Sequence, residues 1–398
     1  MICKITKKKI SSIINFGKMP LANGFLKKNQ FKEEFFYSME AGFNKELSLF
    51  QINDHPKPKK IFNSNYPFFT GSSKFMIKHF KNYSNFIKKR LGKHKNIIEI
   101  GSNDGTFLSN FSKKKYNCLG FEPSKNVCDI AKKRGIKSIN NFFNLQNVKK
   151  QKKFINNTNI ICASNVICHI PNLVDLIKSV HLLLEKNGKF IFEEPYLGSM
   201  YEKVSYDQIY DEHIFMFSAS SVKKTFKLFG LYLNDAIPQI THGGSMRYVV
   251  SKKDFMSKRL NQILKNEKKY KIDKIDAALK FKKKCKYSRD LLRKKIFDLK
   301  KKGKKICGYG ATSKSTTILN YCNINHKHID FICDTTPEKQ NKFSPGAHIP
   351  IKTMDYFYKN IPSHIYLFAW NHKKEIFKKE KKIMKKVKWF SHVILKNN

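Results

Sequence analysis

The segment 96–122 contains residues suited to binding a nucleoside. An apolar run after Asn96 predicts a strand that leads into the turn GSNDG, and a second strand, 117–121, ends beside the acid Glu122. Glycine lets the backbone turn sharply, and an acid at the next strand end can accept hydrogen bonds from both ribose hydroxyls. Because the turn is not GxGxxG, it lacks the helix N-terminus that binds a pyrophosphate. The segment favours S-adenosylmethionine, although an ordinary strand–helix turn explains it equally well when taken alone.

The segment SYDQIYDEHIFMFS, residues 205–218, gathers groups that could move a proton. A histidine beside carboxylates, as in His213 after Asp211 and Glu212, is a natural general base. The Tyr210 hydroxyl can donate a hydrogen bond to an oxygen that becomes negative. Adjacent side chains do not share a face, so not all four can point at one substrate. A polar loop with a surface histidine is the alternative.

Two further segments add polar side chains. NVICHI places His169 just past the predicted strand 159–164, and THGGSMRY supplies His242, two glycines and Arg247. Glycines permit close backbone approach, and an arginine there could grip a phosphate or carboxylate. No HExxH motif or Cys/His spacing occurs, so the sequence predicts no metal site.

Strands and helices alternate over most of the chain, which predicts an α/β fold with a doubly wound, Rossmann-like sheet. Apolar periodicity predicts a helix over 72–91. The predicted strands are 97–101, 117–121, 159–164, 188–193, 305–309, 329–333 and 364–369. We expect four parts: a small N-terminal lobe (1–65), a cofactor-binding domain (66–255), a basic helical connector (256–302) and a second Rossmann-like domain (303–398).

The last two parts each leave an alternative open. The connector is interpreted as a solvated helical bridge between domains, with a nucleic-acid arm as the alternative. The turn GYGATSKS resembles a dinucleotide fingerprint without its last glycine, and Asp334 follows the next strand. It indicates either a nucleotide-recognition domain or a structural lobe in which Gly308 and Gly310 serve the turn.

Composition limits the classes of partner and compartment. The net charge is +49, but only six of the 79 basic residues are arginine, the residue that base- and phosphate-binding surfaces favour. We interpret the lysines, with abundant Asn, Ile and Phe, as a product of A/T-rich codons, and expect no specific nucleic-acid partner. Nine cysteines without a CxxC pair indicate a reduced, cytoplasmic protein. No apolar run predicts a signal peptide or a membrane span.

Several segments, in order, resemble the three-part S-adenosylmethionine-dependent C-methyltransferases that act on nucleotide-linked deoxyketosugars. The resemblance covers nearly the whole chain. It rests on FGKMPLANGFL (16–26), YPFFTGSSKFM (66–76), EIGSNDGTFL (99–108), NVICHIPN (165–172), IYDEH (209–213), HGGSMR (242–247), GYGATSKSTTILNYC (308–322), DTTPEKQNKFSPGAHIPI (334–351) and FAWN (368–371).

The resemblance implies roles for residues at the matching positions. His213 would remove a proton beside the sugar ketone. The groups lining that site would be Tyr210, Glu212 and His169. The cofactor-binding residues would be Glu99, Gly101, Asn103, Gly105, Glu122 and Asn165. The substrate-binding residues would be Tyr66, His242, Gly243, Arg247, Gly310 and Lys314.

The chain departs from that family at two places. The family's N-terminal lobe usually holds zinc on four cysteines, but here only Cys3 is a cysteine and the other positions fall near Thr6, Asn44 and Leu47. One thiolate cannot make a structural zinc site, so we expect a zinc-free lobe. Its packing would rest on Phe16, Leu21, Phe25, Phe43 and Leu49. Asp211 replaces a histidine, and would either raise the pKa of His213 or face water.

The leading expectation is a methyltransferase that acts on a carbon of a nucleotide-activated ketosugar, as a monomer or homodimer. A small-molecule O- or N-methyltransferase of the same fold is the first alternative. A nucleic-acid methyltransferase or RNA-binding protein and a decayed, non-catalytic sugar-binding relative are the others.

Overall fold

The N-terminal lobe is an antiparallel sheet that is completed by the middle of the chain. The structure is a computed structural model that describes residues 1–64, 66, 68–91 and 95–395. The sheet has the order β1-β2-β3-β9. Its strands are β1 (Ser11–Pro20), β2 (Phe36–Asn44), β3 (Leu49–Ile52) and β9 (Phe215–Met216). Because β9 begins two residues after His213, the lobe is joined to the chemistry-bearing loop by backbone hydrogen bonds.

The middle domain is built on a seven-stranded sheet of order β10-β11-β8-β7-β4-β5-β6, in which β10, β11 and β8 pair antiparallel and the others parallel. Its strands are β4 (Asn96–Ile100), β5 (Asn117–Phe121), β6 (Ser138–Ile139), β7 (Thr158–Ser164), β8 (Leu184–Pro195), β10 (Tyr232–Gln239) and β11 (Ser245–Ser251). Its helices are α1 (Pro58–Ile61), α2 (Lys74–Lys88), α3 (Lys125–Lys133), α4 (Leu145–Lys149), α5 (Leu173–Leu183), α6 (Leu197–Lys203) and α7 (Ala219–Lys227).

The predicted elements of this domain are present with small differences at their ends. Helix α2 begins at Lys74 rather than at Ser72, because the Ser73 side chain caps it by accepting a hydrogen bond from the Met76 amide. Strand β8 begins at Leu184, earlier than predicted, since its polar start still pairs with β7.

The C-terminal domain contains a second, wholly parallel sheet of order β14-β13-β12-β15-β16. This topology confirms the Rossmann-like prediction. The strands are β12 (Ile306–Tyr309), β13 (Phe331–Cys333), β14 (Ile351–Lys352), β15 (His364–Leu367) and β16 (Lys388–Phe390). The helices are α10 (Ser313–Tyr321), α11 (Met354–Lys359), α12 (Lys373–Lys379) and α13 (Lys381–Met384).

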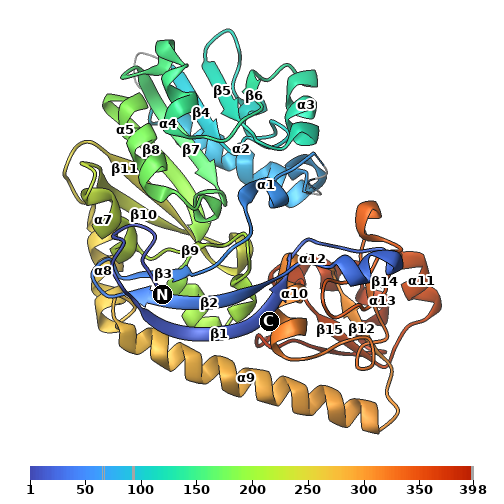
Figure 1. The fold of residues 1–398 in the computed structure, drawn as a ribbon. Helices are drawn as coiled ribbons and strands as arrows, with labels where there is room; N and C mark the ends of the chain where they lie inside the picture. The colour runs from blue at the N-terminus through green and yellow to red at the C-terminus, as the bar shows by residue number, and fades with distance from the viewer. Residues whose placement is uncertain (65, 67, 92–94, 396–398) are drawn as a thin grey trace.

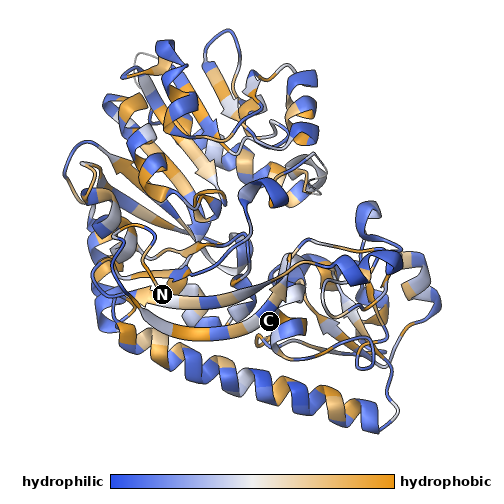
Figure 2. Cartoon of the chain, in the orientation of Figure 1, coloured by the Kyte–Doolittle hydropathy of each residue, from blue (hydrophilic) through white to orange (hydrophobic). Residues whose placement is uncertain are grey.

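The connector consists of α8 (Lys258–Lys269) and the 27-residue α9 (Ile275–Lys301). Figure 1 shows α9 running beneath the N-terminal sheet toward the C-terminal domain. It is mostly hydrophilic in Figure 2, with hydrophobic residues at intervals. One stripe is buried, including Phe281 and Ile296. This amphipathic pattern supports the bridge rather than a free arm.

The state of the cysteines and the character of the helices were also addressed by the sequence analysis. All nine cysteines are free thiols, and all but the partly buried Cys118 are buried. Among the described residues, no helix combines the length and the apolar character needed to cross a bilayer.

Candidate active site

A cavity of about 580 Å³ extends from the carboxyl ends of the middle strands to the C-terminal domain. This is the edge at which open α/β sheets bind ligands. Strand-end residues line one part of it: Gly101, Asn103, Glu122, Ser164 and Asn165. The residues predicted to be catalytic line another part, namely His169, Tyr210, Glu212 and His213, together with the predicted substrate-binding residue Tyr66. The C-terminal domain adds Thr312, Ser313 and Lys314. One cavity therefore joins the two sites that the sequence predicted separately.

The glycine turn after β4 fits a nucleoside. Gly101 has φ +66°, and a Cβ there would lie 2.5 Å from a methyl carbon of Val166, so no side chain fits. The Glu122 carboxylate accepts hydrogen bonds from the amides of Asn103 (3.0 Å) and Ser124 (2.8 Å), which orient it at the cavity wall. Nearby, Oδ1 of Asn165 is buried with no protein partner. These groups match what a ribose needs, so the chain's own residues suit S-adenosylmethionine.

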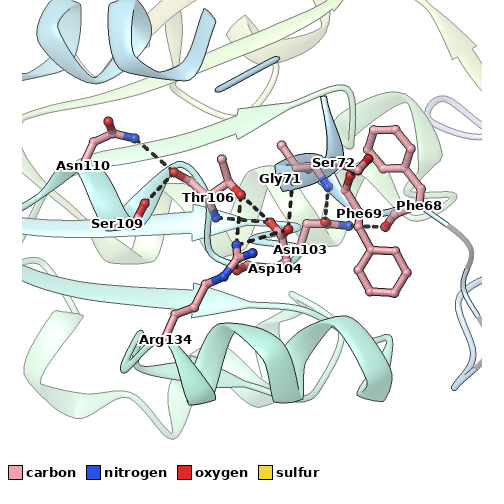
Figure 3. Close-up of polar contacts among 11 residues, drawn as sticks. Phe68, Phe69, Gly71, Ser72, Asn103, Asp104, Thr106, Ser109, Asn110 and Arg134 are labelled. Atoms are coloured by element: carbon pink, nitrogen blue, oxygen red, sulfur yellow. Dashed lines mark hydrogen bonds and ion pairs between the residues drawn. The ribbon is translucent and has the colours of Figure 1, made fainter. Parts of the chain in front are cut away.

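The segment 68–72 covers the glycine turn, as Figure 3 shows. Asn103 accepts from the Thr70 amide at 2.9 Å and donates to the Phe68 carbonyl at 3.1 Å. Asp104 accepts from the Gly71 amide at 2.9 Å and pairs with Arg134 at 3.2 Å. These side chains hold together two loops that are more than 30 residues apart in the sequence. Asp104 and Arg134 were missed by the sequence analysis, because only the fold brings them together.

Two predicted cofactor residues shape the turn without reaching the cavity. Glu99 is buried within β4, away from the cavity lining, and its burial raises its pKa well above the usual value. Gly105 has φ +76°, and a Cβ there would lie 2.9 Å from Ile136. Their predicted contact with the cofactor is therefore corrected to a role in packing the strand and the turn.

The loop before β9 fixes the orientation of the His213 ring. Its Nδ1 lies 2.7 Å from the Gln208 carbonyl, and its Nε2 lies 2.7 Å from the Tyr210 hydroxyl. Because a carbonyl only accepts, Nδ1 carries the hydrogen of the neutral ring, and Nε2 accepts from the tyrosine. His169 stacks on this ring with centroids 5.3 Å apart. Burial lowers the pKa of both histidines, that of His169 to about 3, so both are neutral.

The two acids of the loop face the N-terminal lobe. Glu212 accepts from the Asn23 side chain at 2.6 Å and still lines the cavity. Asp211 accepts from the Ala22 amide at 3.1 Å and is 2 % exposed. Burial raises the pKa of both carboxyls. Asp211 neither contacts His213 nor faces water, which corrects both expectations. Its position is set by the lobe that packs on the loop.

Only part of the segment 241–248 contributes to the site. His242 lines the cavity, and its carbonyl accepts from the Gln208 side chain at 2.6 Å. A Cβ at Gly243 would lie 2.2 Å from the Trp370 ring. This glycine does not line the cavity and instead allows the C-terminal domain to approach.

Arg247 is not a substrate ligand, contrary to the sequence prediction. Its Nε donates to Glu193 at 2.7 Å, and its guanidinium lies 4.3 Å from the Tyr83 ring centroid. It is 6 % exposed and does not line the cavity. Glu193 also pairs with His79 at 2.6 Å. Arg247 is thus part of a buried ion cluster between β11, β8 and α2.

In the C-terminal domain, Lys314 faces the cavity and Gly310 does not. Gly310 has φ +89° and makes the turn after β12, where Asp334 accepts from the Ala311 amide at 2.7 Å. Unlike Glu122, Asp334 does not line the cavity, which favours a structural lobe over a ribose site. Lys314 is 7 % exposed, and its Nζ has no hydrogen-bond partner. Burial lowers its pKa to about 8.

The C-terminal domain also anchors the start of the loop through a residue the sequence analysis missed. Asp207 accepts from the Trp370 indole at 2.6 Å and lies 3.1 Å from Nε2 of His392. It is fully buried and precedes Gln208, whose carbonyl orients His213. No local signal marks Asp207, since both partners lie more than 150 residues away.

The N-terminal lobe positions at which the resemblance implied a zinc site do not suit a metal. The Cys3 thiol accepts from the amides of Ile5 and Thr6, both at 3.4 Å. Asn44 donates to the Thr6 hydroxyl at 3.3 Å, and Leu47 is 2 % exposed. One thiol, a hydroxyl, an amide and an isobutyl group do not fit a four-ligand zinc site. Side-chain hydrogen bonds and apolar packing connect the two turns instead.

Comparisons with known proteins match this architecture along most of the chain. Residues 74–235 match a methyltransferase domain, and residues 240–394 match the C-methyltransferase C-terminal domain. The chain is 25% identical over 378 residues to C-methyltransferase NovU of Streptomyces niveus, with 94% of this chain and 90% of that protein covered.

Solved structures are similar over less of the chain. One is a complex of the Haloferax volcanii Trm112 methyltransferase activator with a methyltransferase, at 11% identity and a TM-score of 0.37, covering 46% of this chain and 95% of that one. Another is an S-adenosylmethionine-dependent methyltransferase of Thermotoga maritima, at 19% identity and a TM-score of 0.35, covering 45% of this chain and 92% of that one.

Proposed function

Because the chain belongs to the C-methyltransferases and is an S-adenosylmethionine-dependent enzyme, we propose that it methylates a carbon beside the ketone of a nucleotide-linked deoxysugar. The observation that carries this proposal is the single cavity that Glu122, His213 and Lys314 all line. Its lining combines a strand-end acid, a neutral imidazole and an amine, which suit a ribose, a C–H group beside a ketone and an anionic group respectively. When bound, S-adenosylmethionine supplies an electrophilic methyl group.

Carbon methylation requires that a C–H bond be broken first. A carbon beside a ketone loses its proton to a base, and the electron pair moves onto the carbonyl oxygen as an enolate. Nε2 of His213 is the nitrogen that bears no hydrogen, because the Gln208 carbonyl holds the ring hydrogen on Nδ1, and its lone pair accepts from the Tyr210 hydroxyl. Burial keeps this ring neutral before the reaction. His213 is therefore the proposed proton acceptor.

The neighbouring groups complete the proposed site. The Tyr210 hydroxyl lies 2.7 Å from Nε2, so it can hold the ring and then donate to the enolate oxygen. Tyr66 and Glu212 line the same part of the cavity. Burial raises the pKa of both, so each can donate a hydrogen bond at neutral pH. Lys314 would attract the phosphates of the nucleotide, since its buried amine has no hydrogen-bond partner and only lies over the Trp370 ring, 5.1 Å from the centroid.

Solvent exchange tests this chemistry. In heavy water, with S-adenosylhomocysteine present, the enzyme should introduce deuterium beside the ketone of a nucleotide-linked ketosugar without transferring a methyl group. An O- or N-methyltransferase has no need of that step. His213→Ala should lose both exchange and transfer while keeping cofactor affinity. His181→Ala, an exposed histidine outside the cavity, is the matched control. Full exchange by His213→Ala would show that another group is the base.

A further inference from the structure

Folding brings together three metal-ligating groups that no sequence spacing predicts. The Cys168 thiol and one ring nitrogen each of His169 and His213 all lie within 4.8 Å of one another. Cys168 is 1 % exposed and His213 is 3 % exposed. Nε2 of His169 is buried and has no hydrogen-bond partner. Cys168 and His169 end a short 3-10 turn after β7, whereas His213 comes from the loop before β9.

We propose that Cys168, His169 and His213 bind a thiophilic divalent cation such as Zn²⁺, and that the bound ion blocks proton transfer at His213. A thiolate with two imidazoles is a donor set that zinc prefers, and three protein ligands leave one position open to the cavity. Ligand atoms of a tetrahedral zinc site are about 3.5 Å apart. Each side chain must therefore move by only about 1 Å, which rotation about its own bonds provides.

Metal binding and base function exclude each other because they need the same lone pair. The Gln208 carbonyl holds the hydrogen on Nδ1 of His213, so the cation takes Nε2 and displaces the Tyr210 hydroxyl. The Cys168 thiol loses its proton to solvent when it becomes a ligand. The site itself does not depend on the proposed reaction. Only the inhibition rests on the proposed function.

Cobalt binding tests the site without any measurement of turnover. Co²⁺ added to the full-length protein should give thiolate-to-cobalt charge-transfer absorption that saturates at one equivalent and is removed by Zn²⁺. Cys168→Ser should lose this absorption, and Cys168→Ala gives the same expectation if the serine variant does not fold. Cys118→Ser, which changes a partly buried cysteine outside the cluster, should keep it. No such absorption in the wild type, or its survival in Cys168→Ser, would overturn the proposal.

Inhibition is measured as the ratio of methyl-transfer rates with and without Zn²⁺ for each protein. The zinc concentration for half inhibition should rise at least about tenfold in Cys168→Ser, since losing even an outer-shell partner of a metal weakens binding by that much. Cobalt absorption without zinc inhibition would leave the metal site standing and refute His213 as the base. Equal zinc sensitivity in both proteins would refute the inhibitory role of the site.

Discussion

The Tyr210 hydroxyl lies 2.7 Å from Nε2 of His213, three residues later in the same loop. The ring is held on its other side by the Gln208 carbonyl, also at 2.7 Å. A single short loop therefore sets both the tautomer and the direction of the imidazole. The loop is itself held by the lobe through Asp211 and by the C-terminal domain through Asp207. The N-terminal lobe, the middle domain and the C-terminal domain thus all help to position one nitrogen atom.

Tyr210→Phe should lower kcat by about 10²–10³-fold, the usual cost of losing a hydrogen bond to a developing oxyanion. The affinity for S-adenosylmethionine should not change, because the hydroxyl contacts the base and not the glycine turn. Steady-state kinetics and calorimetric titration of the cofactor measure the two effects. Tyr201→Phe is the control, since that buried hydroxyl has no hydrogen-bond partner. An unchanged kcat for Tyr210→Phe would exclude this role.

Lys314 should make substrate binding weaken as the pH rises. Burial lowers its pKa to about 8, so the free enzyme carries this charge below pH 8 and loses it above. The KM for an anionic substrate should therefore increase between about pH 7 and pH 9. Lys314→Met should have a higher KM at pH 7 and lack this increase. The exposed Lys382→Met should behave like the wild type. The same pH profile in Lys314→Met would show that another group is responsible.

Arg247→Met should destabilise the fold and leave the KM of the substrate unchanged. The variant leaves the buried Glu193 carboxylate with His79 as its remaining charged partner. Removing one partner of a buried ion pair lowers the free energy of unfolding by about 3–5 kcal/mol. Urea unfolding gives the free energy, and kinetics on the folded fraction give the KM. The double variant Arg247→Met with Glu193→Gln should recover part of the loss. A large increase in KM at wild-type stability would restore Arg247 as a substrate ligand.

Gly101→Ala should weaken cofactor binding by more than backbone strain alone explains. Gly101 and Gly303 share φ +66°, but a Cβ at Gly303 meets nothing within 4 Å, whereas one at Gly101 meets Val166 at 2.5 Å. Gly303→Ala therefore measures the strain of the left-handed backbone, about 1–2 kcal/mol. Thermal unfolding and cofactor titration of both variants separate the cost of the left-handed backbone from the cost of the clash with Val166. Equal behaviour would mean that Val166 moves aside and the turn tolerates a side chain.

Much of the fold could be predicted because its signals are local. The strands β4, β5 and β7 are apolar runs with turn residues at their ends, and such patterns depend only on neighbours in the chain. The turn that contains Gly101 could be predicted for the same reason. So could the position of Glu122, because this residue directly follows the end of β5, where it lines the cavity. The second sheet was predicted for the same reason. Among the predicted elements only the ends differed, since caps such as Ser73 decide them. The N-terminal sheet and the strands β6, β10, β11, β14 and β16 were not predicted.

The sequence by itself determined which chemical groups the protein has and the strand ends at which most of them lie. The tertiary structure alone decided their partners. Arg247 lies opposite Glu193 in the pairing of β11 with β8. In this register the guanidinium forms an ion pair with Glu193 and does not bind the substrate that the sequence analysis assigned to it. Cys168 meets His213 because the loop before β9 pairs with the turn after β7, and Lys314 enters the cavity without a hydrogen-bond partner because the C-terminal domain packs against the middle domain. Contacts between distant segments leave no periodic trace in the chain, since each partner looks locally like an ordinary polar residue.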